Sequence, residues 1–509
     1  MADGFQLQER SLAIIAHLRT RVAQFFLDRK RRVEFFVLFL LCVAAFLVRV
    51  WGMSRFHYWD EMVYLQNAQV ICCGKTNYSE LDFRPPLLSV MLAGVFLVWH
   101  SIYAACIATA LLNALGPAFL YLAGRRAVGR LPAAIAALLL AFSPFFVGIF
   151  PDGFVSDDTG NSLLSDSPAL TLVLLAFWLL LRALERQTIS RFAWAGLALA
   201  STILMRFGSL PSAGILLLLP LAAKQRGKAL TCCGLGIFLG LAPYLLWSRL
   251  HFGGFFYTLS AGWAGVVDQP ESFFFYLRNA AVIFTPVALL GLVLAAPSSL
   301  WRLVRGPSQL RTPAPLASSR SATFLQAFLW LWLVADFLFF SAMPHKEPRY
   351  LLPLVPPFLL LAGSGLALLS ALPGKVLRPA GALLLAALLV FTFLPLRLRF
   401  SNPFIDRGEP QELLASQFLQ STVPPGTGLY MNFNFPAFAF YTNFPIHELP
   451  AVGPALYDGI ARIPPGGVLI VYRKSEGEVW APDLDWMDAN PRFQRLRDFS
   501  TFVVYRRIA

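Results

Sequence analysis

Two neighbouring carboxylates, Asp60 and Glu61, stand in the stretch HYWDE at positions 57–61, shortly after the first long apolar run. Adjacent carboxylates can act as a general base with an orienting partner, or as metal ligands. The same pair also fits a solvated face beside a helix end. The first interpretation predicts that Asp60 and Glu61 take part in abstracting a proton from a hydroxyl group.

A second charged cluster, HKEPR at positions 345–349, contains His345, Lys346, Glu347 and Arg349. Lysine and arginine hold phosphate oxygens, and the arginine fork can donate two hydrogen bonds at once. The alternative is a set of interfacial side chains with internal salt bridges. A base on one loop and a phosphate-binding cluster on another suit the transfer of a group from a lipid phosphate.

Asp166 lies at the start of a further apolar run, in the stretch LLSDSPAL at 163–170. An ionisable residue at membrane depth is costly and is by default a functional candidate. In a first helical turn, Asp166 would also stabilise the helix dipole and cap the turn, so a purely local role stays open.

The elements that must position these residues are long and apolar. The chain has 509 residues, of which 57% are hydrophobic and only 14% are charged, whereas a soluble domain averages about 25% charged residues. The mean hydropathy is +0.61. Several runs reach the roughly 17–25 residues that a transmembrane helix needs, whereas a β-barrel would show short alternating segments. The sequence therefore predicts an all-α polytopic membrane protein.

Hydropathy predicts an odd number of spans, about 11. They are expected at 33–51, 101–122, 131–150, 163–181, 192–206, 209–223, 229–247, 279–300, 323–342, 351–371 and 379–396. The apolar segment Pro85–Trp99 is shorter and is interpreted as a juxtamembrane helix, with a further full span as the alternative.

Basic residues indicate the orientation. Residues 1–32 show a basic pattern of helical spacing, which predicts an amphipathic helix on the cytoplasmic surface. No removable signal peptide is expected after it. Basic junctions at 124–130, 182–191, 224–228, 301–320 and 375–378 alternate with less basic loops at 52–100, 151–162, 248–278 and 343–350, and positive charge favours the cytoplasmic side. HYWDE and HKEPR are therefore expected together on the outer face.

The net charge of +14 would suggest nucleic-acid binding if position were ignored. The basic residues lie between apolar runs, where membrane orientation explains them, and no basic-aromatic stripe is present. We therefore expect the lipid bilayer, and no nucleic acid, as a partner.

The composition changes after Leu396. Residues 397–509 contain polar turns, the β-like runs GVLIVYR and FVVYRR, and the amphipathic stretch PQELLASQFLQ. This pattern predicts a small α/β domain on the same side as HYWDE, after a transmembrane domain at 33–396. Of the six cysteines, two adjacent pairs lack metal-ligand spacing. We expect the cysteines to be unpaired small hydrophobic residues, with a disulfide between distant cysteines as the alternative.

Local patterns resemble the GT-C superfamily of integral-membrane glycosyltransferases, which use polyprenyl-phosphate-linked sugars. HYWDEMVY at 57–64 and FRPPLLS at 83–89 are similar to the first outer loop of the protein O-mannosyltransferase and lipid A aminoarabinose transferase branch, as is LLSDSPAL at 163–170. SAMPHKEPRYLLPLVPPFLLLAG at 341–363 is similar to the HKExR segment of mannosyltransferases that build lipid-linked oligosaccharides and GPI anchors. The sequence thus combines features of two branches.

The resemblance implies a role for each matching residue. Asp60 would be the base on the acceptor hydroxyl, and Glu61 its neighbour in orientation or acceptor binding. Lys346 and Arg349 would face the donor phosphate, with His345 and Glu347 at the sugar or in support. Arg84 would contact donor or acceptor, and Asp166 would complete the acidic side. Members generally invert the anomeric centre by direct displacement. No cofactor is certain, since metal dependence varies across the superfamily, and a divalent metal stays open.

The leading hypothesis is a glycosyltransferase that moves a sugar from a polyprenyl-phosphate donor to an acceptor hydroxyl, in a bacterial inner membrane with a periplasmic site. A transporter or flippase would predict repeats and charges at the membrane midplane, neither of which is evident. A polysaccharide ligase would also use basic outer loops but has less need of the acidic pair. The sequence names neither the sugar nor the acceptor, which can be lipid, glycan or protein.

Overall fold

The computed structural model describes residues 28–51, 59–147, 163–264, 271–305, 319–397, 409–450, 453–473 and 483–508. The expected surface helix at 1–32 lies outside these residues except at its end, and His57 lies outside them too. From Arg29 to Phe393, every regular element among the described residues is helical.

The helices of this first part follow one another with short connections. In chain order they are α2 (Arg29–Val50), α3 (Trp59–Cys73), α4 (Leu87–Val98), α5 (Ile102–Ala114), α6 (Gly116–Ala127), α7 (Arg130–Phe142), η1 (Pro144–Val147), α8 (Asp166–Arg186), α9 (Ile189–Met205), η2 (Phe207–Ser209), α10 (Leu210–Leu216), η3 (Leu219–Ala222), α11 (Arg226–Phe252), α12 (Tyr257–Ala264), α13 (Phe275–Arg278), α14 (Ala280–Phe284), α15 (Pro286–Arg305), α16 (Ser319–Ala342), η4 (Pro348–Leu354), α17 (Val355–Ala367), η5 (Leu368–Ala371) and α18 (Leu377–Phe393).

The predicted membrane spans correspond to helices. Six stretches in the described part are long and apolar enough to cross a membrane: Arg32–Val50, Ile102–Ala127, Asp166–Arg186, Arg226–Phe252, Thr323–Ala342 and Pro348–Ala371. Six shorter apolar helices of 10–17 residues accompany them, among them α4, the expected juxtamembrane helix. Each of the about 11 expected spans coincides with a helix or with consecutive helical segments. The prediction of a polytopic helical membrane domain is confirmed.

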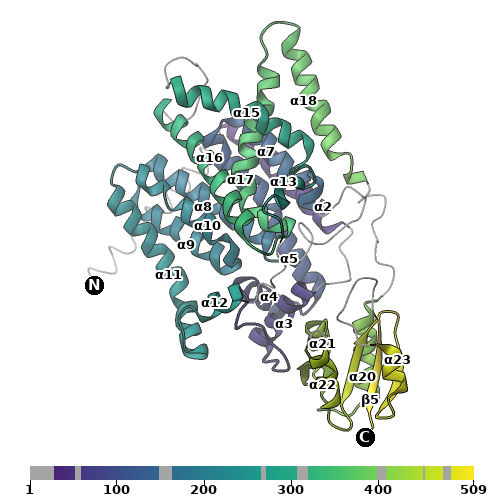
Figure 1. The fold of residues 1–509 in the computed structure, drawn as a ribbon. Coiled ribbons are helices and arrows are strands. Elements are labelled where there is room, and N and C mark those ends of the chain that lie inside the picture. Colours follow the sequence, from purple (N-terminus) through teal and green to yellow (C-terminus); the bar gives the residue numbers. More distant parts are fainter. Residues whose placement is uncertain are drawn as a thin grey trace, which may run out of the picture.

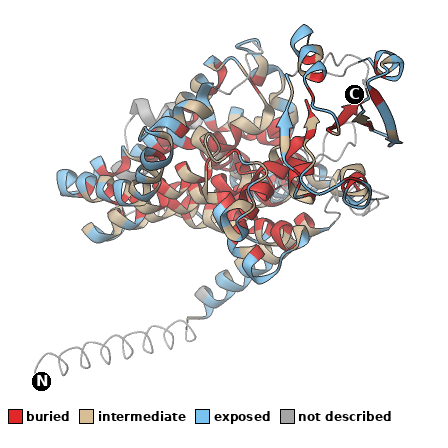
Figure 2. Cartoon of the chain, turned by 90° about the horizontal axis from the view of Figure 1, so that it is seen from below, coloured by how far each residue is buried: buried red, intermediate tan, exposed pale blue. Residues whose placement is uncertain are grey.

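The outer helices present apolar side chains to their surroundings. On α2, only 17% of the most apolar window is buried inside the protein, and Phe35, Phe36 and Phe39 are exposed. Figure 2 shows buried residues gathered in the interior of the bundle and exposed residues along its periphery. Large exposed apolar surfaces of this kind require lipid rather than water around them.

Small residues allow the helices to pack closely. A Cβ atom built on Gly196 of α9 would lie 2.1 Å from the carbonyl oxygen of Cys233 on α11, and one on Gly236 of α11 would lie 2.2 Å from that of Ala193. Such backbone approach is typical of helix pairs in membranes. This close contact holds α9 and α11 side by side.

The C-terminal part is a small α/β domain, as the β-like runs predict. Its elements are α20 (Gln411–Thr422), β1 (Leu429–Met431), α21 (Phe435–Tyr441), β2 (Ile446–Glu448), α22 (Pro454–Ala461), β3 (Val468–Tyr472), α23 (Leu484–Ala489), β4 (Phe493–Asp498) and β5 (Phe502–Arg507). The strand order is β2-β1-β3-β5-β4. Strand β1 pairs in parallel with β2 and β3, whereas β5 pairs antiparallel with β3 and β4.

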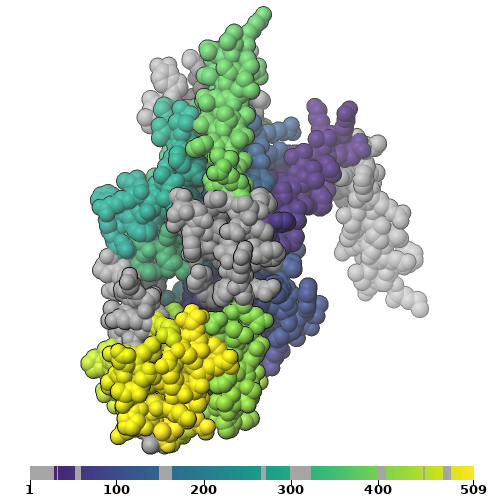
Figure 3. Space-filling view, turned by 90° about the vertical axis from the view of Figure 1, so that its right-hand side faces the viewer, coloured from purple at the N-terminus to yellow at the C-terminus, as the bar shows by residue number. Residues whose placement is uncertain are grey.

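The C-terminal domain lies against α3. Figure 1 shows α3 and α4 at the end of the bundle that faces this domain, while the connection between α17 and α18 lies at the opposite end. Figure 3 shows the same separation, with the domain in yellow at one end and α18 at the other. The Trp59 ring meets that of Phe435 edge-on at 4.1 Å, and the Asn77 amide donates to the carbonyl oxygens of Ala439 and Thr442 at 2.9 and 3.0 Å. The first residue of α3 is thus held by the C-terminal domain.

Candidate active site

Asp60 and Glu61 lie in the first turn of α3. Hydropathy indicates only a polar loop in this part of the sequence. Acidic residues favour this position because the helix dipole is positive there. Successive side chains of a helix diverge by about 100°. The two neighbouring acids therefore face different surroundings.

Asp60 contacts two arginines from distant parts of the chain. Arg84 Nη2 lies 2.7 Å from Asp60 Oδ1, and Arg349 Nη2 lies 3.0 Å from Asp60 Oδ2. Burial raises the pKa of Asp60, but the two guanidinium groups outweigh it and hold the pKa below its ordinary value of 3.8. The low pKa keeps the carboxylate ionised, and 27% of the Asp60 side chain is exposed, so it is also accessible.

Both arginines have further acidic partners. Arg84 Nε lies 2.9 Å from the buried Glu80, which also accepts a hydrogen bond from Tyr78 at 2.6 Å. Arg349 pairs with Glu347 through its Nε atom. These contacts fix the direction of each guanidinium group, so that its remaining donors point to Asp60.

Glu347 joins the residues of the HKEPR cluster. Its Oε1 atom lies 3.0 Å from His345 Nε2 and accepts a hydrogen bond of 3.0 Å from the Tyr350 hydroxyl. Burial raises the pKa of Glu347, but Arg349 and the hydrogen bonds from Arg349, His345 and Tyr350 together lower it below 4.5. An ionised Glu347 can thus hold His345 and Arg349 in place.

Lys346 faces a different direction from Arg349. It is 6% exposed, and its ammonium group donates to the carbonyl oxygens of Glu271, at 3.0 Å, and of Met343. The structure therefore brings Lys346 next to the chain at Glu271, not into the ion pairs around Asp60.

Asp166 pairs with Arg206, a residue that sequence reasoning missed. Arg206 Nη1 lies 2.7 Å from Asp166 Oδ2, and Asp166 is only 2% exposed. The Arg206 guanidinium also lies over the Tyr350 ring at 4.9 Å, which links this pair to the HKEPR cluster. Its place at the end of the apolar helix α9 could have indicated this pair, because a charged residue at membrane depth needs a partner of opposite charge.

Glu61, the second acid of the pair, is only 1% exposed. Its Oε1 atom accepts a hydrogen bond of 2.7 Å from the backbone N–H of Leu163, and the hydroxyl groups of Tyr64 and Ser165 lie 2.9 Å apart. Two residues of the HYWDEMVY motif thereby hold α3 against the chain just before Asp166. Glu61 therefore links the first turn of α3 to the segment that leads into α8.

One cysteine pair differs from the expectation of unpaired thiols. Cys72 and Cys73 at the end of α3 form a disulfide, while Cys42, Cys106, Cys232 and Cys233 are free. Within the described ranges, one group of three potential metal ligands occurs, formed by Cys72, Cys73 and His100. Because disulfide sulfurs are not thiolates, this group lacks the ligands that bind metals strongly.

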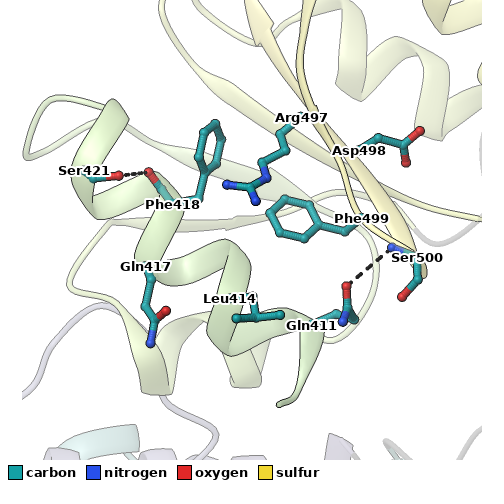
Figure 4. A pocket seen from close by; sticks show the side chains of 9 residues that line it. All are labelled: Gln411, Leu414, Gln417, Phe418, Ser421, Arg497, Asp498, Phe499 and Ser500. Atoms are coloured by element: carbon teal, nitrogen blue, oxygen red, sulfur yellow. Dashed lines mark hydrogen bonds between the residues drawn. The ribbon is translucent and has the colours of Figure 1, made fainter. Parts of the chain in front are cut away.

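The C-terminal domain contains a separate hollow of about 480 Å³ between α20 and the turn from β4 to β5. Figure 4 shows the Arg497 guanidinium between the rings of Phe418 and Phe499, 5.0 and 5.2 Å from their centres. None of the residues predicted for catalysis or donor binding lines this hollow. It is a feature of the C-terminal domain alone.

Two sequence families match consecutive parts of the chain. Residues 83–247 match the dolichyl-phosphate-mannose-protein mannosyltransferase family, and residues 268–415 match the Alg9-like mannosyltransferase family. Comparison with curated proteins gives no match. The two matched families correspond to the two branches whose motifs the sequence combines.

Solved structures share the fold at low sequence identity. ArnT from Cupriavidus metallidurans bound to undecaprenyl phosphate aligns with a TM-score of 0.61 at 14% identity, over 92% of this chain and 98% of that protein. The Archaeoglobus fulgidus oligosaccharyltransferase in its apo form aligns with a TM-score of 0.61 at 11% identity, over 88% and 70%. AglB from the same organism, in complex with an inhibitory peptide and a dolichol-phosphate, aligns with a TM-score of 0.58 at 12% identity, over 87% and 69%.

The family matches extend over more than half of the chain, and the fold extends over nearly all of it. Together they confirm the resemblance to GT-C glycosyltransferases. The chain is an integral-membrane glycosyltransferase of GT-C type.

Proposed function

We propose that this glycosyltransferase moves a sugar from a polyprenyl-phosphate donor to an acceptor hydroxyl, with Asp60 as the base. The observation that carries the proposal is the contact of Asp60 with both Arg84 and Arg349. The proposed proton acceptor thus lies within hydrogen-bond distance of two cations that could bind a phosphate. Displacement at a phosphate-linked sugar needs a base for the attacking hydroxyl on one side of the anomeric carbon and cations for the leaving phosphate on the other.

In the proposed reaction, the acceptor oxygen forms a bond to the anomeric carbon while the bond from that carbon to the phosphate oxygen breaks. The bonding electrons leave with the phosphate, and the hydroxyl proton moves to Asp60. Because attack and departure occur on opposite faces, the anomeric configuration inverts. The negative charge of the leaving phosphate is stabilised by Arg84 and Arg349.

Donor binding would also change the basicity of Asp60. In the structure, both guanidinium groups are engaged with this carboxylate, which lowers its pKa and weakens it as a base. A donor phosphate competes for the same donors, so the carboxylate loses part of its stabilisation and becomes a better proton acceptor. The arrangement would therefore couple donor binding to activation of the base.

The other predicted residues would support this core. Asp166 and Arg206 would form the wall beside Tyr350, and His345 and Glu347 would hold Arg349 and contact the sugar. Lys346 would order the chain at Glu271. We place the site on the periplasmic face of a bacterial inner membrane, since the basic junctions predict that orientation.

The proposal is tested by transfer from defined donors. Purified full-length protein is reconstituted with radiolabelled polyprenyl-phosphate sugars and a membrane extract that supplies acceptors. We expect loss of label from one donor, label in an acceptor fraction, and stoichiometric free polyprenyl phosphate. Transfer from a nucleotide sugar without any lipid-linked donor would contradict the proposal, as would release of polyprenyl diphosphate.

A further inference from the structure

A polar hollow of about 450 Å³ lies at the far end of α3, next to the end of α4 and the C-terminal domain. Its polar lining consists of Gln69, Lys75, Thr76, Asn77, His100 and Asn443, and none of the lining residues is acidic. Helix α3 rises about 1.5 Å per residue, so Cys73 beside this hollow is about 20 Å along the helix from Asp60. The hollow is therefore separate from the Asp60 cluster.

The position of the hollow beside a candidate membrane span suggests the level of the lipid headgroups. His100 precedes by two residues the membrane-spanning stretch that begins at Ile102. Beside it, the apolar side chains of Leu97, Val98 and Trp99 are 72%, 90% and 60% exposed. Tryptophan is enriched where hydrocarbon meets headgroups. A lipid whose chains lie along these exposed residues would present its headgroup to His100 and Lys75.

Lys75 supplies a cation there without an acidic partner among the described residues. Its ammonium group donates to Gln69 Oε1 at 2.9 Å and to the carbonyl oxygen of Phe440 at 2.6 Å. An ammonium group has three N–H bonds, so one is left after these contacts. Burial lowers the pKa of Lys75 to about 8, and a bound anion would restore the charged form.

We propose that this hollow binds the phosphate of an anionic membrane phospholipid, with Lys75 and His100 as the charged and polar donors and Thr76 as a further donor. The position at headgroup level favours a lipid over a free anion, because the exposed apolar residues would bind the acyl chains. The proposal does not depend on which donor or acceptor the enzyme uses.

Binding of defined lipids to the full-length protein in a neutral detergent tests the proposal. Phosphatidylglycerol and phosphatidylcholine are titrated separately and bound lipids are counted by native mass spectrometry. We expect one phosphatidylglycerol site with roughly ten-fold tighter binding than phosphatidylcholine. Lys75→Gln should weaken phosphatidylglycerol binding roughly ten-fold and His100→Gln roughly three-fold, whereas Lys228→Gln, at an exposed lysine of α11, should leave it unchanged.

Several outcomes would overturn the proposal. Equal affinity for the two lipids would show that the headgroup charge is not recognised. Loss of binding in Arg349→Gln but not in Lys75→Gln would place the lipid in the Asp60 cluster. An effect of Lys75→Gln alone, with His100→Gln and Thr76→Val unchanged, would mean that Lys75 acts through its contact with Phe440. Displacement of the lipid by millimolar inorganic phosphate would assign the site to a free anion.

Discussion

Arg349 Nη2 lies 3.0 Å from Asp60 Oδ2, although 289 residues separate them in the sequence. The contact joins the first turn of α3 to the segment that opens η4 and α17. In the absence of substrate, the proposed base and the proposed phosphate ligand thus neutralise each other. The two clusters that the sequence presents as separate motifs form one electrostatic unit.

Removal of Arg349 should impair donor binding. Arg349→Ala removes the guanidinium group that the donor phosphate would share with Asp60, so we expect the KM for the lipid-linked donor to rise roughly 10- to 100-fold. Arg349→Lys keeps the charge without the fork and should lie in between. Arg462→Ala, at an exposed arginine that follows α22, serves as the control. An equal loss for donor and acceptor would indicate a structural role for Arg349.

The two acids of HYWDE should separate in their effects. Glu61→Ala leaves the buried N–H of Leu163 without its partner, so unfolding should become easier by about 1–3 kcal/mol. Glu61→Gln retains an oxygen acceptor and should keep most of the activity. Thermal unfolding and transfer rates of both variants check this. A stable Glu61→Gln protein without transfer activity would instead assign Glu61 a direct role in the reaction.

Arg206 should matter for stability through Asp166. Arg206→Leu leaves a carboxylate that is only 2% exposed without its cation, which costs roughly 3–5 kcal/mol for a buried pair. The double variant Asp166→Asn, Arg206→Gln removes both charges and should recover part of the melting temperature. If the double variant were less stable than Arg206→Leu, the ion pair would not be the cause.

The pH dependence should follow the partners of Asp60. Its pKa is depressed, so Asp60 is ionised at neutral pH and loses its charge only as the pH falls through a value below 3.8. Removal of Arg84 leaves burial opposed by Arg349 alone, which raises the pKa of Asp60. We therefore expect the acidic limb of kcat/KM to move to higher pH in Arg84→Gln. A shift to lower pH, or none, would contradict this assignment of charges.

The membrane helices could be predicted from the sequence, because the hydropathy of a segment indicates whether lipid or water surrounds it. The runs at 467–473 and 502–507 likewise predicted β3 and β5, since short continuous apolar runs fit strands that are buried on both faces. The helix α3 could not be predicted from hydropathy, because its burial depends on α4 and the C-terminal domain. For the same reason, Arg206 and the separate environments of Asp60 and Glu61 are visible only once the helices are packed.

The most direct measurement of the central claim is single-turnover transfer by Asp60→Asn with a labelled polyprenyl-phosphate sugar already bound. We predict that donor binding persists, because Arg84 and Arg349 are released from Asp60 and remain free for the phosphate, while transfer falls by at least about 100-fold, the usual contribution of a general base. Asp458→Asn, at an exposed acid of α22, should transfer at the wild-type rate. Transfer by Asp60→Asn at a rate close to that of the wild type would contradict the assignment of Asp60 as the base.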